Sequence, residues 1–221
     1  MPELPEVETI VRELDKIITG KTISRFLVYD TKRITKPIIP LPQRVTSVSR
    51  HGKYIVCETH GGLRCIVHLR MTGELLYEAR SMRHETRSTK HGTRGRKLKA
   101  DDQKIAHERV RFRFTDGSIL RFIDIRRFGT VEWHGRAKSL PSLGIDPLSQ
   151  NFSPKAFLDL SRGTKRSVKS FLLDQQKIAG IGNIYADEAL WHAKIRPTRK
   201  AGSLGVAEAG SLVRAIKRVL N

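Results

Sequence analysis

The sequence predicts an α+β protein in which an N-terminal helix and an antiparallel β-sandwich domain precede a smaller helical domain. Two observations support this class. Apolar residues recur at helical spacing near the start, alternate with polar residues through the middle of the chain, and return to helical spacing after Ser153. In addition, the 221 residues are enough for two compact units, and a 38% share of apolar residues excludes a wholly disordered chain.

The first helix is predicted from Glu6 to Ile18. Pro5 suits a first helical turn, and Gly20 ends the pattern. The apolar residues at helical spacing are Val7, Ile10, Val11, Leu14, Ile17 and Ile18.

From Thr22 to about Trp133 the residues alternate between apolar and polar, as in half-buried strands. Turn signals stand at residues 60–62 (His-Gly-Gly) and 116–117 (Asp-Gly). Short antiparallel strands at this spacing favour a β-sandwich or a barrel-like domain. The alternating stretches are "TISRFLVYD", "RVTSVSR", "KYIVCET", "LRCIVHLRM", "GELLYEA", "RVRFRFTDGSILRFIDI" and "GTVEWH".

Two stretches interrupt these patterns. Residues 79–104 are polar, mostly basic and without periodicity, and we expect a long mobile loop that is either a solvated insert or a non-specific contact for phosphate. Residues 139–152 are rich in proline and small polar residues and predict a linker. The first domain then spans residues 1–138 and the helical domain residues 153–221. The four helices expected in the helical domain are "SPKAFLDLSR", "SVKSFLLDQ", "NIYADEALWHAKI" and "VAEAGSLVRAIKRVL".

Charge is the strongest signal of function. Lys plus Arg number 42 against 22 Asp plus Glu, a net charge of +20, which favours nucleic acid as the partner over a generically basic ribosomal or membrane-surface protein. No stretch approaches the roughly 18 apolar residues of a membrane span, and the acidic start is not a secretory signal. Cys57 and Cys65 are expected to be reduced core thiols rather than a disulfide, and no Cys/His spacing resembles a zinc site.

The helical half contains a candidate phosphate site in "QKIAGIGNIYADEALWHAKIRP". Two glycines allow close approach of the backbone to a ligand, and Asn183 is predicted to be the N-cap of the helix that follows. A helix N-terminus suits a phosphate, and Lys165, Arg166 and Lys169 upstream add positive charge. The alternative is that Gly-Ile-Gly simply forms a tight turn between two helices.

Two short motifs could act on a base stack. In "HLRMTG" Met71 stands at a strand end, and in "DIRRFGT" the expected strand alternation places Arg126 and Phe128 on one face and Arg127 on the other. Residues in such positions most often pack in the core or form a mixed strand face. In a DNA-binding protein, an apolar side chain beside an arginine can instead wedge into the stack and replace a missing base.

The opening "MPELPEVETI" could be catalytic. If Met1 is removed, Pro2 carries a secondary amine that titrates near pH 8, so that part of it is nucleophilic at neutral pH. Attack on the anomeric carbon of a sugar gives an iminium, and Glu3 can supply a proton. The alternative is that these residues merely lead into the first helix.

Taken together, these residues resemble the formamidopyrimidine-DNA glycosylase family of bacterial base-excision enzymes. The matching motifs follow the family's order over nearly the whole chain. They are "PELPEVET", "HGKYI", "HLRMTG", "RRFGT", "FLLDQ", "GIGNIYADEAL" and "AKIRP".

The resemblance implies a bifunctional DNA glycosylase and abasic-site lyase that removes 8-oxoguanine and formamidopyrimidines from duplex DNA. Pro2 would attack the sugar, Glu3 would protonate the base or the sugar, and the iminium would allow β,δ-elimination. Lys53 would contact a phosphate and donate a proton. Further positions matching DNA contacts are Met71, His107, Arg126, Phe128, Lys165, Lys169 and Asn183, of which Arg126 would pair with the orphaned cytosine.

The chain also departs from the family. The basic insert is longer than expected, and the family's zinc finger of four cysteines has no counterpart, because no Cys follows Cys65. We therefore expect no cofactor in this chain. The expected protein is monomeric, binds damaged double-stranded DNA and no membrane, and works in the bacterial cytoplasm at the nucleoid. The alternatives are a catalytically weak, finger-less remnant that still binds damaged DNA, and a basic RNA-binding protein.

Overall fold

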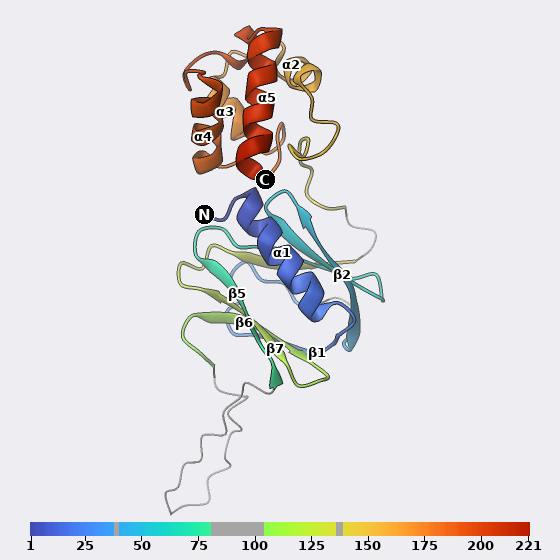
Figure 1. Cartoon of the computed structure of the whole chain (residues 1–221). Helices are drawn as coiled ribbons and strands as arrows, with labels where there is room; N and C mark the ends of the chain where they lie inside the picture. The colour runs from blue at the N-terminus through green and yellow to red at the C-terminus, as the bar shows by residue number, and fades with distance from the viewer. Residues whose placement is uncertain (38–39, 81–103, 136–138) are drawn as a thin grey trace, which may run out of the picture. The chain divides into compact units, whose positions relative to one another are not determined.

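A computed structural model describes residues 1–37, 40–80, 104–135 and 139–221 (Figure 1). The loop predicted over residues 79–104 falls almost entirely outside these ranges. The chain divides into two compact units. The first contains Met1, Asp15–Val48 and Val56–Arg136, and the second contains Pro2–Leu14, Ser49–Ile55 and Ala137–Asn221. The second unit therefore combines the C-terminal helices with the start of the chain and the tip of one hairpin.

The N-terminal helix α1 runs from Leu4 to Ile18, so it begins two residues before the predicted start. It buries an apolar stripe at the spacing of one helix face, as its sequence pattern predicts. The buried members are Leu4, Val7, Val11, Leu14 and Ile18.

Eight strands follow in the described ranges, and each alternating stretch of the sequence contains at least one of them. They hydrogen-bond in the order β5-β7-β6-β1-β2-β3-β4-β8. The described pairs are antiparallel, so the predicted sequence of an N-terminal helix, an antiparallel sheet and a helical region is confirmed. The strands are β1 (Thr22–Val28), β2 (Gln43–His51), β3 (Tyr54–Thr59), β4 (Arg64–His68), β5 (Gly73–Glu78), β6 (Glu108–Phe114), β7 (Ile119–Asp124) and β8 (Thr130–His134).

Aromatic rings fill part of the core of the first unit. Phe26 lies edge-on to Phe112 and to Trp133, with ring centroids 5.0 and 5.5 Å apart. Cys57 and Cys65 are buried and free, which confirms the expectation of reduced core thiols. Burial raises the pKa of the Cys57 thiol to about 12, so this sulfur stays protonated and unreactive.

The second unit contains the four predicted helices around one apolar core. Ser153 and Ser167 cap the first two of these helices with their hydroxyl groups. None of the described helices is long and apolar enough to cross a membrane. The helices are α2 (Pro154–Ser161), α3 (Val168–Leu172), α4 (Asn183–Ala193) and α5 (Val206–Leu220), with a short 3₁₀ helix at Ala201–Ser203.

Candidate active site and nucleic-acid interface

The Glu3 carboxylate, from the start of the chain, caps helix α4. It accepts hydrogen bonds from the backbone N–H groups of Gly182 at 2.7 Å, Ile184 at 3.0 Å and Tyr185 at 3.4 Å. Glu3 is only 3% exposed. These three N–H donors fix the orientation of the carboxylate, which in turn satisfies free donors at the start of the helix. An acidic group is therefore held in place one residue after Pro2.

The prediction that Asn183 is the N-cap of α4 is wrong. The N-cap is Gly182, which has no side chain, and the exposed Asn183 is the first helical residue. The physical reason is space, because a Cβ atom built on Gly182 would lie 2.3 Å from Cδ of Glu3. Glu3 thus supplies the capping oxygens, and the Asn183 side chain is left at the surface for another role.

A glycine turn before α4 holds the N-terminal segment. The Leu4 N–H donates to the carbonyl of Gly180 at 3.0 Å, and Gly180 adopts the left-handed conformation, with φ 88°. Gln175 braces this turn, since its amide accepts from Gly180 N at 2.9 Å and donates to Ile181 O at 2.8 Å. The residue spacing within "QKIAGIGNIYADEALWHAKIRP" does not indicate that Gln175 braces the turn.

Lys53 lies in the two-residue turn between β2 and β3 and is 6% exposed. Its neighbour Gly52 has φ 60°, and a Cβ built there would lie 3.8 Å from the backbone nitrogen of Gly180. Arg50 ties the turn to α1, because its guanidinium bonds Glu8 at 2.7 Å and the carbonyl of Gly52 at 3.3 Å. The turn that carries Lys53 and the segment that carries Glu3 thus both lie against the glycine turn before α4.

Glu6 and Tyr185 form a second link between the start of the chain and α4. The Glu6 carboxylate accepts from the Glu3 N–H at 2.9 Å and from the Tyr185 hydroxyl at 2.8 Å. Burial and the bond to Glu6 raise the pKa of Tyr185 to about 12, so the hydroxyl remains a donor. The three-residue spacing of Glu3 and Glu6 could have indicated the first bond, whereas nothing in the sequence pairs Glu6 with Tyr185.

Two loops of the first unit carry the candidate gap-filling residues, which would replace a missing base. These residues are Met71, Arg126 and Phe128. Met71 lies between β4 and β5 and is 47% exposed, and Phe128 lies between β7 and β8 and is 40% exposed. The strand alternation expected of Arg126, Arg127 and Phe128 is wrong, because β7 ends at Asp124 and the chain turns. Arg126 nevertheless stacks on Phe128, with its guanidinium carbon 4.9 Å from the ring centroid, while Arg127 pairs with Asp30.

The remaining predicted contacts are cationic or polar side chains at the surface. His107 is exposed on the turn before β6, with φ 59°. Lys165 is exposed in the loop before α3, whereas the Lys169 ammonium bonds Asp187 at 2.8 Å. Each lies within one unit: Lys165, Lys169, Asn183, Pro2, Glu3 and Lys53 in the second, and Met71, His107, Arg126 and Phe128 in the first.

Metal-binding side chains do not gather in the described ranges. There, no group of three or more His, Cys, Asp or Glu side chains is arranged to hold a metal ion. The two cysteines of the chain are buried on neighbouring strands, β3 and β4. The residues present therefore do not fit a four-cysteine zinc finger.

Comparison with known proteins gives consistent matches over both units. The formamidopyrimidine-DNA glycosylase N-terminal domain matches residues 1–131, and the formamidopyrimidine-DNA glycosylase H2TH domain matches residues 143–221. The formamidopyrimidine-DNA glycosylase of Geobacter metallireducens is 41% identical over all of this chain and 78% of its own length. That of Enterococcus faecalis is 35% identical over all of this chain and 75% of its own length.

Solved structures agree with these matches. The Lactococcus lactis formamidopyrimidine-DNA glycosylase bound non-covalently to DNA with an abasic site is 30% identical and superposes with a TM-score of 0.82, covering 99% of this chain and 80% of that one. The MutM (Fpg) protein of Thermus thermophilus is 33% identical, with a TM-score of 0.81 over 99% of this chain and 74% of that one.

Proposed function

The chain belongs to the formamidopyrimidine-DNA glycosylase family, and from that premise we propose that it excises oxidised purines, 8-oxoguanine and formamidopyrimidines, from duplex DNA and then cleaves the strand. The observation that carries the proposal is the Glu3 carboxylate, buried beside Pro2 and fixed by three backbone donors. A segment that merely led into a helix would not need a buried acid at this position. We also propose that the protein acts as a monomer in the bacterial cytoplasm, and the bacterial origin of its relatives supports this compartment.

The first step is attack by Pro2 once Met1 has been removed. The amine nitrogen forms a bond to C1′ of the damaged nucleotide, and the glycosidic bond breaks, so that the base leaves with the bonding electrons and takes up a proton. The attacking nitrogen loses its own proton, and its lone pair then expels O4′ and forms the iminium. Glu3 is placed to accept the proton from nitrogen and give it to the base, and O4′ takes up a second proton, supplied by water, as the ring opens.

The iminium then makes strand cleavage possible. It acidifies the protons at C2′, so that loss of one expels the 3′-phosphate, and a second elimination expels the 5′-phosphate. Lys53, held near the glycine turn by Arg50, contacts a phosphate beside the lesion and donates a proton in these steps. The proposed chemistry uses an amine, a carboxylate and a lysine of this chain and calls on no cofactor.

Recognition uses the remaining residues. Met71, Arg126 and Phe128 fill the gap left when the damaged nucleotide is extruded, and Arg126 pairs with the orphaned cytosine. Asn183, exposed at the start of α4, contacts phosphate with Lys165 and Lys169 in the second unit, and His107 contacts DNA from the first unit. The stack of Arg126 on Phe128 supports this assignment, because it presents a guanidinium and an aromatic ring as one unit.

Reductive trapping tests the proposal. The protein is incubated with a duplex that carries 8-oxoguanine opposite cytosine, and borohydride is added to reduce the iminium. We expect a covalent adduct that is lost in Pro2→Gly and in protein that retains Met1, and that persists in Pro5→Ala as the matched control. Salt-sensitive binding without an adduct would identify a DNA-binding remnant. Stronger binding to RNA than to a duplex with an abasic site, measured alongside, would identify an RNA-binding protein.

A further inference from the structure

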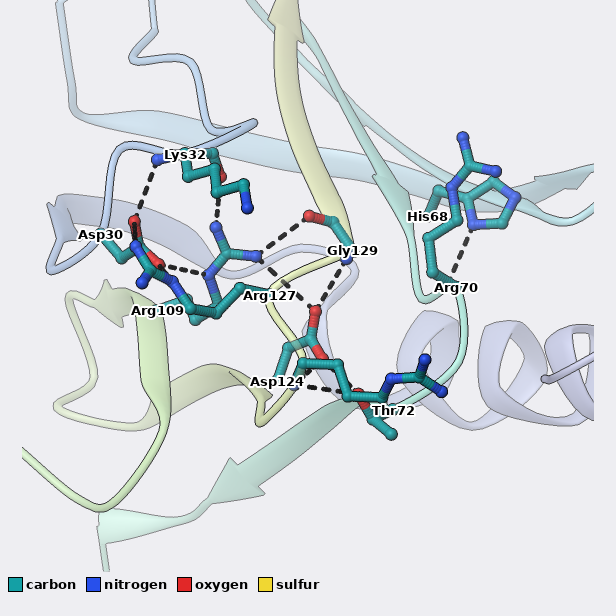
Figure 2. Close-up of polar contacts among 10 residues, drawn as sticks. Asp30, Lys32, His68, Arg70, Thr72, Arg109, Asp124, Arg127 and Gly129 are labelled. Atoms are coloured by element: carbon teal, nitrogen blue, oxygen red, sulfur yellow. Dashed lines mark hydrogen bonds and ion pairs between the residues drawn. The ribbon is translucent and has the colours of Figure 1, made fainter.

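A buried carboxylate lies between the two loops that carry the gap-filling residues (Figure 2). Asp124, the last residue of β7, is 1% exposed. The loops are the Met71 loop, residues 69–72, and the Arg126 loop, residues 125–129. Because Asp124 belongs to neither loop, its contacts show whether the two loops are held independently or as one body.

Asp124 bonds both loops at once. Its Oδ1 accepts from the Thr72 hydroxyl at 2.5 Å and from the Arg126 N–H at 3.2 Å, and its Oδ2 accepts from the Gly129 N–H at 2.7 Å. A Cβ on Gly129 would lie 3.1 Å from Oδ2, so the loop backbone closes tightly on the carboxylate. One side chain therefore fixes the residue after Met71 and both ends of the Arg126 loop.

A buried arginine, Arg109, adds ionic contacts to the arrangement around Asp124. Arg109, also 1% exposed, lies 3.6 Å from Asp124 Oδ2, donates to the carbonyl of Gly129 at 3.1 Å, and bonds Asp30 at 3.1 Å. Asp30 in turn binds the Arg127 guanidinium at 2.5 and 2.9 Å. Charges of alternating sign thus run from Asp124 through Arg109 and Asp30 to Arg127, back in the Arg126 loop (Figure 2).

The carboxylates of this chain of charges are held ionised. The Arg127 hydrogen bond lowers the pKa of Asp30 far below its usual range. Burial alone would raise the pKa of Asp124, but hydrogen bonds from Thr72, Gly129 and Arg126 outweigh it and lower the pKa. At neutral pH the Asp124 carboxylate therefore accepts hydrogen bonds and donates none.

Both loops also contain a residue in the left-handed region. Arg70 has φ 56° and Arg127 has φ 60°, a conformation that residues with side chains rarely adopt unless their surroundings hold them there. Each stands next to a gap-filling residue. The Arg70 N–H is held by Nδ1 of His68 at 3.0 Å and the Arg127 side chain by Asp30. The loops are therefore fixed in shape before any DNA is bound.

We propose that Asp124 is the positioning residue for base replacement: it locks the Met71 loop to the Arg126 loop so that the three side chains enter the duplex as one rigid body. The inference rests on the proposed function. Asp124 itself does not touch the reacting atoms. Its loss should weaken recognition of the lesion and of the base opposite, and leave the Pro2 chemistry intact.

Asp124→Asn tests this, because it keeps the size of the side chain and replaces one acceptor oxygen with a donor that faces Arg109 or the Gly129 N–H. Two substrates separate recognition from chemistry. On a duplex with 8-oxoguanine we expect excision opposite cytosine to fall at least tenfold and the preference for cytosine over adenine to shrink toward one. On a single-stranded abasic oligonucleotide, which has no opposite base, borohydride trapping should stay within twofold of wild type.

Two further variants complete the test. Asp116→Asn changes an aspartate that precedes the same strand, bonded to Ser118 and not to either loop, and should leave both assays unchanged. If Asp124→Asn does not fold, Thr72→Val decides, since it removes one of the bonds to Asp124 and should still reduce the preference for cytosine. Unchanged preference in a folded variant would overturn the proposal. Failure of the wild-type protein to trap on either substrate would instead overturn the proposed function.

Discussion

At the scale of single residues, the capping of α4 by Glu3 connects the stability of the fold with the proposed chemistry. A helix whose N-cap is glycine has free N–H groups at its start, and here a carboxylate from the other end of the chain satisfies them. The same bonds that complete the helix also fix the acid beside Pro2. Any change that moves the carboxylate should therefore affect both the stability of the fold and the reaction.

Gly182→Ala is the sharpest test of this link. The new Cβ would lie 2.3 Å from Cδ and from Oε1 of Glu3, so the carboxylate must move. We expect the free energy of unfolding to fall by about 1–2 kcal/mol through loss of the cap, and the rate of borohydride trapping to fall on the order of 100-fold, because catalysis is sensitive to misplacement by an ångström. Chemical denaturation and single-turnover trapping measure the two effects.

Gly205→Ala is the matched control. Gly205 is likewise the N-cap of a helix, α5, but a Cβ there meets only a Glu208 oxygen at 3.8 Å. It should trap at the wild-type rate. Equal trapping by Gly182→Ala and Gly205→Ala would show that the position of Glu3 does not matter for the chemistry.

At the scale of elements, helix α1 contributes to the core of the C-terminal helices through its first residue. Leu4 is fully buried and belongs to the same apolar cluster as Phe171, Ile181 and Leu190. It also packs closely on Gly180, where a Cβ would lie 2.7 Å from Leu4 Cδ1. The start of α1 is thus held by packing as well as by hydrogen bonds.

Leu4→Ala should therefore destabilise the protein by about 3 kcal/mol, the usual cost of deleting a fully buried leucine side chain. Urea denaturation followed by circular dichroism measures this. Ile17→Ala, on the same helix but 37% exposed, should cost less than about 1 kcal/mol. Similar losses for the two variants would contradict the anchoring role of Leu4.

Sequence periodicity located the elements well because a strand or helix with one buried face must repeat its apolar residues at a fixed period. It failed where tertiary contacts replace local ones. The cap of α4 comes from Glu3, far away in sequence, so Asn183 looked like the natural candidate. The spacing of Arg126 and Phe128 suggested strand alternation, but the bonds to Asp124 turn the chain there.

The same limit applies to the candidate site. Short motifs single out Pro2, Glu3 and the gap-filling residues as candidates because the chemistry proposed for them depends on residue type. The residues that position them could not be predicted in this way. Gln175, Arg50 and Tyr185 act through bonds to segments remote in sequence, and no spacing records such bonds.

At the scale of the whole molecule, the net charge of +20 predicts that affinity for DNA depends steeply on salt. Each phosphate that the protein neutralises releases bound counterions and adds about −0.9 to the slope of log K against log salt concentration. Only cations that contact phosphate contribute to this slope, so it separates the interface from the remaining positive charge. Lys165 and Lys169 offer a useful contrast, because Lys169 already bonds Asp187.

We expect Lys165→Ala to weaken binding to a duplex with an abasic site and to make the slope about one unit less steep, because it removes one phosphate contact. Lys169→Ala should change the slope less, since its charge is partly compensated by Asp187. Lys155→Ala, an exposed lysine near the start of α2, is the control and should leave the slope unchanged. Titrations by fluorescence anisotropy from about 50 to 200 mM salt measure all three. Equal slopes for Lys165→Ala and Lys155→Ala would remove Lys165 from the interface and leave Asn183 and the start of α4 as the phosphate contact of the helical unit.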